Sequence, residues 1–339
     1  MASVDLSTSP WLIQIFDRVP VSLPVMGMLI ALAHFLFVTV TALLLSWTLG
    51  GEFLYWGYGY SILAGDIVHS ILVGYLMAAG YYGLREAVRD FLSLRPSLSC
   101  DDTEFNNLLA YLRHVPRSPL YFFSAIALVW GFSTPLLREP APLGSAQMSW
   151  RQFEETLFAF FIFRMVAVEF ASAFFFASIA KRYARIELLD LQLVAPFSQR
   201  ALRGVLVIML FMAILSLLLI FDADPTNSMI GVMLSGSSAV ALFLIPLIPL
   251  QRRIRAEKLS ELARIRAAIR RENEARIAGD EDWAPRADLI IYKQQIEQVS
   301  TWTFNTPTVV RFALYASLGV GSWLGAAFVE RWLGTLLGS

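Results

Sequence analysis

The feature that most constrains this chain is a series of long apolar stretches, such as VLVIMLFMAILSLLLIF at residues 205–221. The hydrocarbon core of a bilayer is about 30 Å thick and takes about 20 apolar residues to cross as a helix. Seven stretches approach or exceed that length: residues 25–49, 60–83, 119–137, 153–180, 204–221, 228–250 and 309–333. Apolar and polar residues do not alternate within them, which excludes membrane-spanning β-strands. The sequence therefore predicts an all-α, polytopic membrane helix bundle with about seven transmembrane helices.

Composition supports a lipid environment. The 339 residues are 57% hydrophobic and 16% charged, whereas soluble domains average about 45–50% apolar and about 25% charged residues. Three histidines and one cysteine exclude a disulfide framework and a cysteine-rich metal site. We expect no metal and no cofactor, and we expect Cys100 to be an inert thiol. The expected partner is the lipid bilayer, not a nucleic acid.

Lysine and arginine are distributed unevenly among the loops. Residues 50–59 and 222–227 contain none, whereas the segments after the second, fourth and sixth stretches contain five, five and eleven. Because basic residues mark cytoplasmic loops, the N-terminus is predicted in the cytoplasm and the C-terminus outside. This orientation requires the third stretch to cross completely. The segment WLIQIF at residues 11–16, followed by Pro20 and Pro24, is typical of a short amphipathic helix at the membrane surface.

Three parts follow from this pattern. Residues 1–250 form the bundle of the first six stretches, residues 251–307 form a cytoplasmic helical hairpin, and residues 308–339 form the last transmembrane helix, packed with the bundle. In the hairpin, a helix that continues from the sixth stretch is expected to end at Gly279, and a second starts near Ala287. Helical spacing of apolar residues predicts the seam between them: Leu259, Leu262, Ile265 and Ile269 on the first helix, and Leu289, Tyr292, Ile296 and Val299 on the second. The hairpin either packs only on itself and the bundle, or also provides an oligomerisation or partner-docking surface.

The segment at residues 184–203 is expected to lie along the cytoplasmic face as an amphipathic elbow. Pro196 is expected to end its helical part. Its two basic residues, Arg200 and Arg203, are then expected to meet lipid phosphates.

Ionisable residues inside the predicted spans form the candidate site. They are His34, Asp66, His69, Arg164 and Glu169. Arg164 and Glu169 point about 140° apart on one helix, so each needs a partner from another helix. We expect Arg164 to pair with Asp66, and Glu169 with His34 or His69. Such a cluster is either a proton or ion path, a gating pair, or a buried salt bridge that fixes helix packing.

The last predicted span carries small residues on one face. Gly321 and Gly325 lie four residues apart, a spacing that lets helix backbones approach closely. We expect this face to contact either Gly236 of the sixth span or the same helix of a neighbouring subunit in a homo-oligomer.

Two stretches, residues 186–203 and 302–331, resemble segments of uncharacterised bacterial multi-pass membrane proteins with no assigned activity. The resemblance implies the class of multi-pass membrane protein and nothing about activity. The expected location is the bacterial inner membrane. No phosphate-binding loop, zinc-protease, nucleophile-elbow or dinucleotide motif is present, so an intramembrane enzyme is disfavoured. The sequence favours a non-enzymatic membrane sensor or scaffold that acts through its cytoplasmic helical extension. The alternative is an oligomeric ion channel or transporter that uses Arg164, Glu169 and Asp66.

Overall fold

The computed structural model describes residues 11–48, 60–115, 117–138, 146–220, 226–277, 287–302 and 306–337. Within them the chain is helical, apart from connecting segments and one antiparallel bridge between Leu98 and Ala184. The helices are α1 (Trp11–Arg18), α2 (Leu23–Thr48), α3 (Tyr60–Ser93), α4 (Asp102–His114), α5 (Arg117–Arg138), α6 (Ala146–Arg182), α7 (Ala195–Leu215), α8 (Thr226–Ile277), α9 (Ala287–Gln298) and α10 (Thr306–Leu337). Short 3-10 turns are η1 (Arg95–Ser97), η2 (Leu191–Val194) and η3 (Ser216–Ile220).

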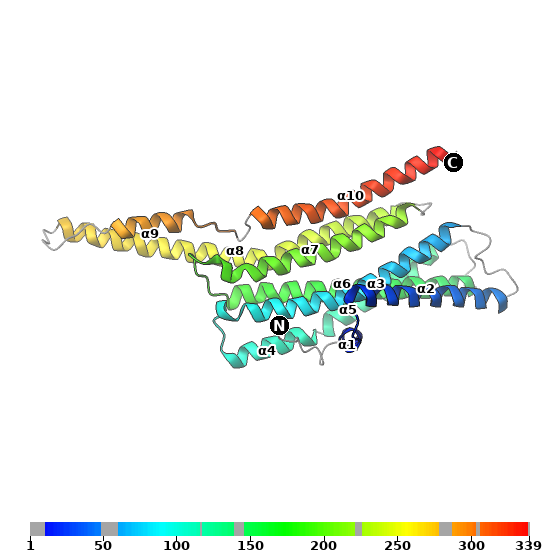
Figure 1. Ribbon diagram of the computed structural model, residues 1–339. Helices are drawn as coiled ribbons and strands as arrows, with labels where there is room; N and C mark the ends of the chain where they lie inside the picture. Colours follow the sequence, from blue (N-terminus) through cyan, green and yellow to red (C-terminus); the bar gives the residue numbers. More distant parts are fainter. Residues whose placement is uncertain are drawn as a thin grey trace.

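The long helices run side by side along one axis, and α8 and α9 extend beyond one end of the bundle (Figure 1). We call this the hairpin end and the opposite end the far end. Six helices are long and apolar enough to cross a membrane over the described residues, which confirms the all-α, multi-pass bundle. Their segments are Leu23–Leu45, Gly65–Ser93, Met148–Arg182, Leu191–Leu218, Met233–Glu274 and Thr308–Ala326.

The third predicted span corresponds to α5, which is not among these six. It packs closely along the first half of α6: a Cβ on Gly131 would overlap the backbone of Thr156, and Trp130 contacts Phe163 edge-to-face. A complete crossing by α5, and with it the count of seven, stays a prediction.

The contacts between α2 and α3 show which part of α3 lies beside the first turn of α2. His34 on α2 lies 2.9 Å from the Ser70 hydroxyl, between Nδ1 and Oγ, and Gly27 faces Gly74 and Ala78. The two helices are therefore antiparallel, and the first turn of α2 lies near Tyr81 of α3. From Tyr81, α3 continues another 12 residues toward the hairpin end, or about 18 Å.

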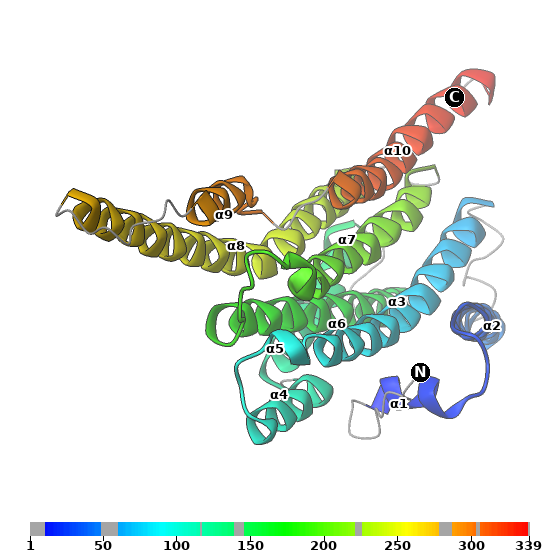
Figure 2. The same ribbon diagram turned by 60° about the vertical axis from the view of Figure 1, so that its left-hand side comes forward.

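The short helix α1 lies at this same level. Its Phe16 is buried and stacks on Tyr81 with ring centroids 5.3 Å apart. Figures 1 and 2 show α1 running across the direction of the long helices. Arg164 of α6 borders the same surface pocket as Tyr81, and α6 then continues 18 residues to Arg182, about 27 Å. Both α3 and α6 thus project far beyond the level of α1.

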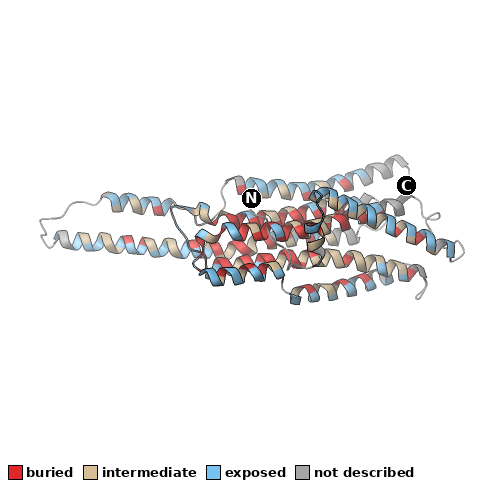
Figure 3. Cartoon of the chain, turned by 60° about the horizontal axis from the view of Figure 1, so that its bottom comes forward, coloured by how far each residue is buried: buried red, intermediate tan, exposed pale blue. Residues whose placement is uncertain are grey.

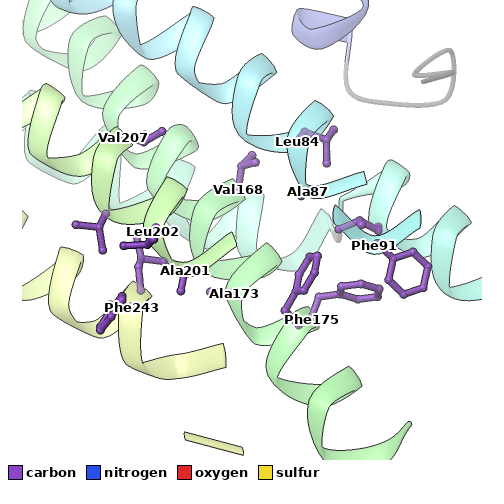
Figure 4. Packing of buried hydrophobic residues seen from close by; sticks show 14 of the residues in the cluster. Leu84, Ala87, Phe91, Val168, Ala173, Phe175, Ala201, Leu202, Val207 and Phe243 are labelled. Carbon is purple, nitrogen blue, oxygen red and sulfur yellow. The ribbon is translucent and has the colours of Figure 1, made fainter. Parts of the chain in front are cut away.

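Burial is concentrated in that projecting part of the bundle, next to the hairpin (Figure 3). Figure 4 shows side chains from α3, α6, α7 and α8 packed together there. The ring centroid of Phe91 lies 5.3 Å from that of Phe175 and 4.7 Å from that of Phe105 of α4. Phe176 packs against Phe197. By contrast, only 11% of the residues in the most apolar segment of α2, and likewise of α10, are buried. The helices at the far end therefore expose most of their apolar surface outward.

The segment around α4 packs against the hairpin end of α3 and α6. Asp101 accepts a hydrogen bond from the backbone N–H of Glu104 and begins the helix, as expected of an N-cap aspartate. Glu104 accepts a 2.5 Å hydrogen bond from the Tyr183 hydroxyl, and this bond raises the pKa of Tyr183. Burial raises the pKa of the Cys100 thiol, which therefore stays protonated at neutral pH.

The helical hairpin exists as α8 and α9. The helix α8 is continuous over 52 residues and includes Pro246 and Pro249. Interior prolines bend helices, and α8 bends between the bundle and its free end (Figure 2). The predicted start of the second helix at Ala287 is confirmed, whereas Gly279 lies outside the described residues.

The seam of the hairpin is shorter than predicted. Leu262, Ile265 and Ile296 are buried in it, with Ile269 and Tyr292 at its edge, but Leu259 is 58% exposed. The Lys258 ammonium donates 2.7 Å hydrogen bonds to the carbonyl oxygens of Glu297 and Val299, at the C-terminal end of α9. The Lys258 charge therefore lies at the C-terminal end of α9, where the last carbonyl oxygens have no partner within the helix.

The role predicted for Pro196 is wrong. Residues 184–190 form no helix, and Pro196 stands in the first turn of α7, where a missing N–H costs nothing. Arg200 and Arg203 therefore belong to a long bundle helix and not to an elbow on the surface.

The packing role predicted for Gly236, Gly321 and Gly325 is also wrong within one chain. A Cβ on any of them would meet no atom within 4 Å, and Gly321 and Gly325 are exposed. The close glycine of α10 is Gly319, which is buried against Met209 and Met212 of α7. Gly321 follows Gly319 by two residues and therefore lies on the opposite side of α10, which points away from α7.

We predict that Gly74→Ala destabilises the fold, because its Cβ would overlap the Gly27 carbonyl and push α2 from α3. Overpacking of this kind typically costs about 1–3 kcal/mol. Gly80→Ala on the same helix is the matched control, since its Cβ meets open space. Thermal unfolding in detergent should show a lower midpoint for Gly74→Ala only; equal midpoints would contradict the close contact.

For the hairpin, we predict that Leu262→Ala loosens α9, because removing a buried leucine side chain costs about 2–5 kcal/mol. Leu259→Ala, three residues away and exposed, should have little effect. Hydrogen–deuterium exchange of residues 287–298 measures the difference. Similar exchange in both variants would mean that the seam does not hold α9.

Candidate functional site

A buried ion pair joins α6 to α7 in the projecting part of the bundle. Arg200 donates from Nη2 to Glu169 Oε2 at 2.6 Å, and from Nε to the Ser172 hydroxyl at 2.7 Å. The two charged side chains are 3% and 0% exposed. Charges removed from water to this degree persist only when each compensates the other.

Two glycines make room for this pair. A Cβ on Gly83 of α3 would overlap Glu169 Oε1, and a Cβ on Gly204 of α7 would lie 3.5 Å from Oε2. Oε1 and Arg200 Nη1 are both buried without a hydrogen-bond partner among the described residues. The Glu169 carboxylate therefore lies wedged between α3 and α7, and both neighbours lack side chains where it sits.

A second ionic contact lies nearby. Arg203, one turn after Arg200, donates to both carboxylate oxygens of Asp90 on α3, and its Nη2 is 3.5 Å from Glu86 Oε2. Asp90 is 4% exposed and Glu86 10%. Together the two arginines of α7 link this helix to α6 and to α3 at one level of the bundle.

These contacts correct three expectations. Arg200 and Arg203 contact carboxylates and not lipid phosphates, and Glu169 pairs with Arg200 and not with a histidine. The sequence pattern RALR placed both arginines on one helix but said nothing about which side of that helix is buried. The acidic residues at positions 86 and 90, four apart and hence on one face of α3, were the available signal for the Arg203 pair.

The histidines and Asp66 lie elsewhere, closer to the far end. His34 is hydrogen-bonded to the Ser70 hydroxyl, which donates a hydrogen bond to the backbone carbonyl oxygen of Asp66 at 2.7 Å. His69 lies 2.9 Å from the Gly65 carbonyl oxygen and packs edge-on against Phe158. Ser70 therefore links His34 to the backbone of α3, and His69 lies one residue before Ser70 on the same helix.

Two further ionisable residues lie near the start of α6. Arg151 and Glu154 form a 3.3 Å ion pair one turn apart. Arg151 lies before residue 153, where the fourth predicted span begins, so it is not among the predicted site residues. No group of three or more potential metal-binding side chains occurs in the described ranges.

Arg164 belongs to neither group. Across the described parts of the chain it has no carboxylate within 4.0 Å and donates no hydrogen bond, and its guanidinium lies 5.7 Å from the Phe160 ring centroid. The predicted pairing with Asp66 is wrong, because Arg164 borders a pocket lined by residues 76–81 of α3, which lie 10 to 15 residues, or about 15–22 Å, from Asp66 along that helix.

Comparisons with protein-family models, with curated proteins and with solved structures found no match. The fold itself nevertheless defines the class. Several helices of membrane-crossing length and composition, packed as one all-α bundle, make this an integral, multi-pass membrane protein that lies in a lipid bilayer.

We predict that Glu169→Gln strongly destabilises the protein, because it leaves the Arg200 charge buried and uncompensated. The expected loss is about 3–5 kcal/mol. The double variant Glu169→Leu with Arg200→Met should recover much of it, since it removes both charges. Arg264→Ala, which breaks an exposed pair with Glu261, is the control and should change stability by less than about 1 kcal/mol.

Thermal and denaturant unfolding in detergent measure these differences. A Glu169→Gln variant as stable as Arg264→Ala would show that the pair does not hold α6 to α7.

Proposed function

We propose that this chain is a non-enzymatic membrane sensor or scaffold that acts through the helical hairpin of α8 and α9. The observation that supports the proposal is the continuity of α8, which extends from the far end of the bundle into the hairpin without a break. A change in the tilt of its membrane segment is therefore carried directly to the hairpin.

The part of α8 beyond the bundle is long enough to turn a small change in tilt into a measurable displacement of the hairpin. From Leu250 to Ile277 the helix advances about 40 Å, so a tilt change of about 10°, within the range that transmembrane helices adopt, moves its tip by about 7 Å. Its base is held to the bundle: Arg253 donates to the Lys181 carbonyl oxygen, and Leu188 packs against the hairpin seam. The loop before α7 thus provides a second connection between hairpin and bundle.

The hairpin presents a basic surface. Exposed arginines lie along its α8 arm, at positions 252, 253, 255, 264, 266, 270 and 271. Such a surface suits an acidic partner. An N-terminus and a hairpin in the cytoplasm of a bacterial inner membrane, as the arginine distribution and the resemblance to bacterial multi-pass proteins suggest, are part of this proposal.

The test measures movement of the hairpin directly. In a Cys100→Ala background, spin labels at Ala263 of α8 and Asn106 of α4, both exposed, report the distance between hairpin and bundle. We expect this distance to differ between nanodiscs with short and long acyl chains, and we expect Leu262→Ala to reduce the difference.

The alternative, an oligomeric ion channel or transporter, is tested in the same preparation. Proteoliposomes should show no ion or proton flux above empty vesicles. A distance that does not depend on bilayer thickness, together with flux that Asp66→Asn abolishes, would contradict the sensor proposal and support the alternative.

A further inference from the structure

Arg164 borders a surface groove between α3 and α6 that is otherwise apolar. Its lining includes Leu76, Met77, Gly80 and Tyr81 from α3, with Phe161 and Met165 from α6. The guanidinium is partly buried, and its only described interaction is with the Phe160 ring. A cation in such a setting requires an anion, since five N–H donors without acceptors are costly to withdraw from water.

A second cation stands beside the same groove. The Arg85 guanidinium lies 5.9 Å from the Tyr81 ring centroid, one helical turn further along α3. Over the residues that the structure describes, it too has no carboxylate within 4.0 Å. Two arginines without a described carboxylate partner next to Tyr81 give the groove a local positive charge.

The level of the groove indicates which anion it meets. Tyr81 stacks on Phe16 of α1, a short amphipathic helix of the type that lies in the membrane interface. The first turn of the strongly apolar α2 lies at the same level. The groove therefore opens where lipid headgroups lie.

The groove is polar at one end and apolar at the other, in the same sense as a phospholipid. Leu76 and Met77 lie five and four residues from Tyr81 toward the far end, and Phe161 lies three residues from Arg164 in the same direction. The arginines thus stand at headgroup level, and the apolar residues follow toward the bilayer interior.

We propose that this groove binds one anionic phospholipid. Arg164 donates hydrogen bonds to the phosphodiester oxygens, for which the planar guanidinium is well suited. Arg85 contributes the second positive charge that favours an anionic headgroup, and an acyl chain lies along Met77 and Phe161. The inference is independent of the proposed sensor function.

Gly80 offers a variant that blocks the groove without disturbing the fold. A Cβ at this position meets no atom within 4 Å, and Gly80 lines the groove, so we expect the side chain of Gly80→Leu to occupy the groove. Arg182→Gln is the matched control for charge, because Arg182 is exposed at the end of the same helix, about 27 Å further along.

The experiment is a titration of delipidated, detergent-solubilised protein with phosphatidylglycerol, followed by native mass spectrometry. We expect one lipid to bind more tightly than the rest. Its affinity should fall about tenfold in Arg164→Gln, as loss of charge-assisted hydrogen bonds implies, and comparably in Gly80→Leu. Arg164→Lys should retain part of the affinity, Arg182→Gln should match wild type, and the unfolding midpoints without lipid should be the same for all variants.

Three results would overturn the proposal. The first is wild-type affinity for phosphatidylglycerol in both Arg164→Gln and Gly80→Leu. The second is equal binding of a diacylglycerol with the same acyl chains, which would mean that the phosphate is not recognised. The third is displacement of the lipid by millimolar inorganic phosphate, which would mean that the site takes a free anion and not a lipid.

Discussion

The ion pair between Glu169 and Arg200 joins α6 to α7 at the place where the bundle is most densely packed. Neither side chain reaches water, so each depends on the other, and separating the two helices would expose both charges to an apolar interior. Arg203 extends the connection to α3 through Asp90 and Glu86. Three long helices are therefore held in one register, and the helices that pack on them, α4, α5, α8 and α10, take their positions from that unit.

The distribution of burial follows from the lengths of these helices. A bilayer core accommodates about 20 helical residues, whereas α3 has 34 and α6 has 37. In lipid there is no hydrophobic driving force between helices, and the far-end parts of α2 and α10 accordingly bury little within the chain. The part of the bundle beyond the level of α1 buries Phe91, Phe176 and Phe197 completely.

Arg200 and Arg164 differ in their surroundings within the bundle. Arg200 lies inside the packed projecting part and has a carboxylate partner from α6. Arg164 lies at the surface groove beside Tyr81, and its only described interaction is with the Phe160 ring. A partner from the chain is required in the first setting, whereas in the second the proposed phospholipid supplies the anion.

The sequence by itself determined the class of fold, because apolar stretches of membrane-crossing length leave only helices, and helical periodicity with a break near residue 286 is enough to predict α9 and most of its seam. It also indicated that ionisable residues inside apolar stretches need partners. Only the tertiary structure decided which partners they have: Glu169 meets Arg200 because Gly83 and Gly204 leave space for a carboxylate, and Gly319 rather than Gly321 faces α7. Periodicity gives the relative directions of residues on one helix, but the rotation and axial offset of that helix against its neighbours are set by packing, and a shift of two residues exchanges a buried glycine for an exposed one.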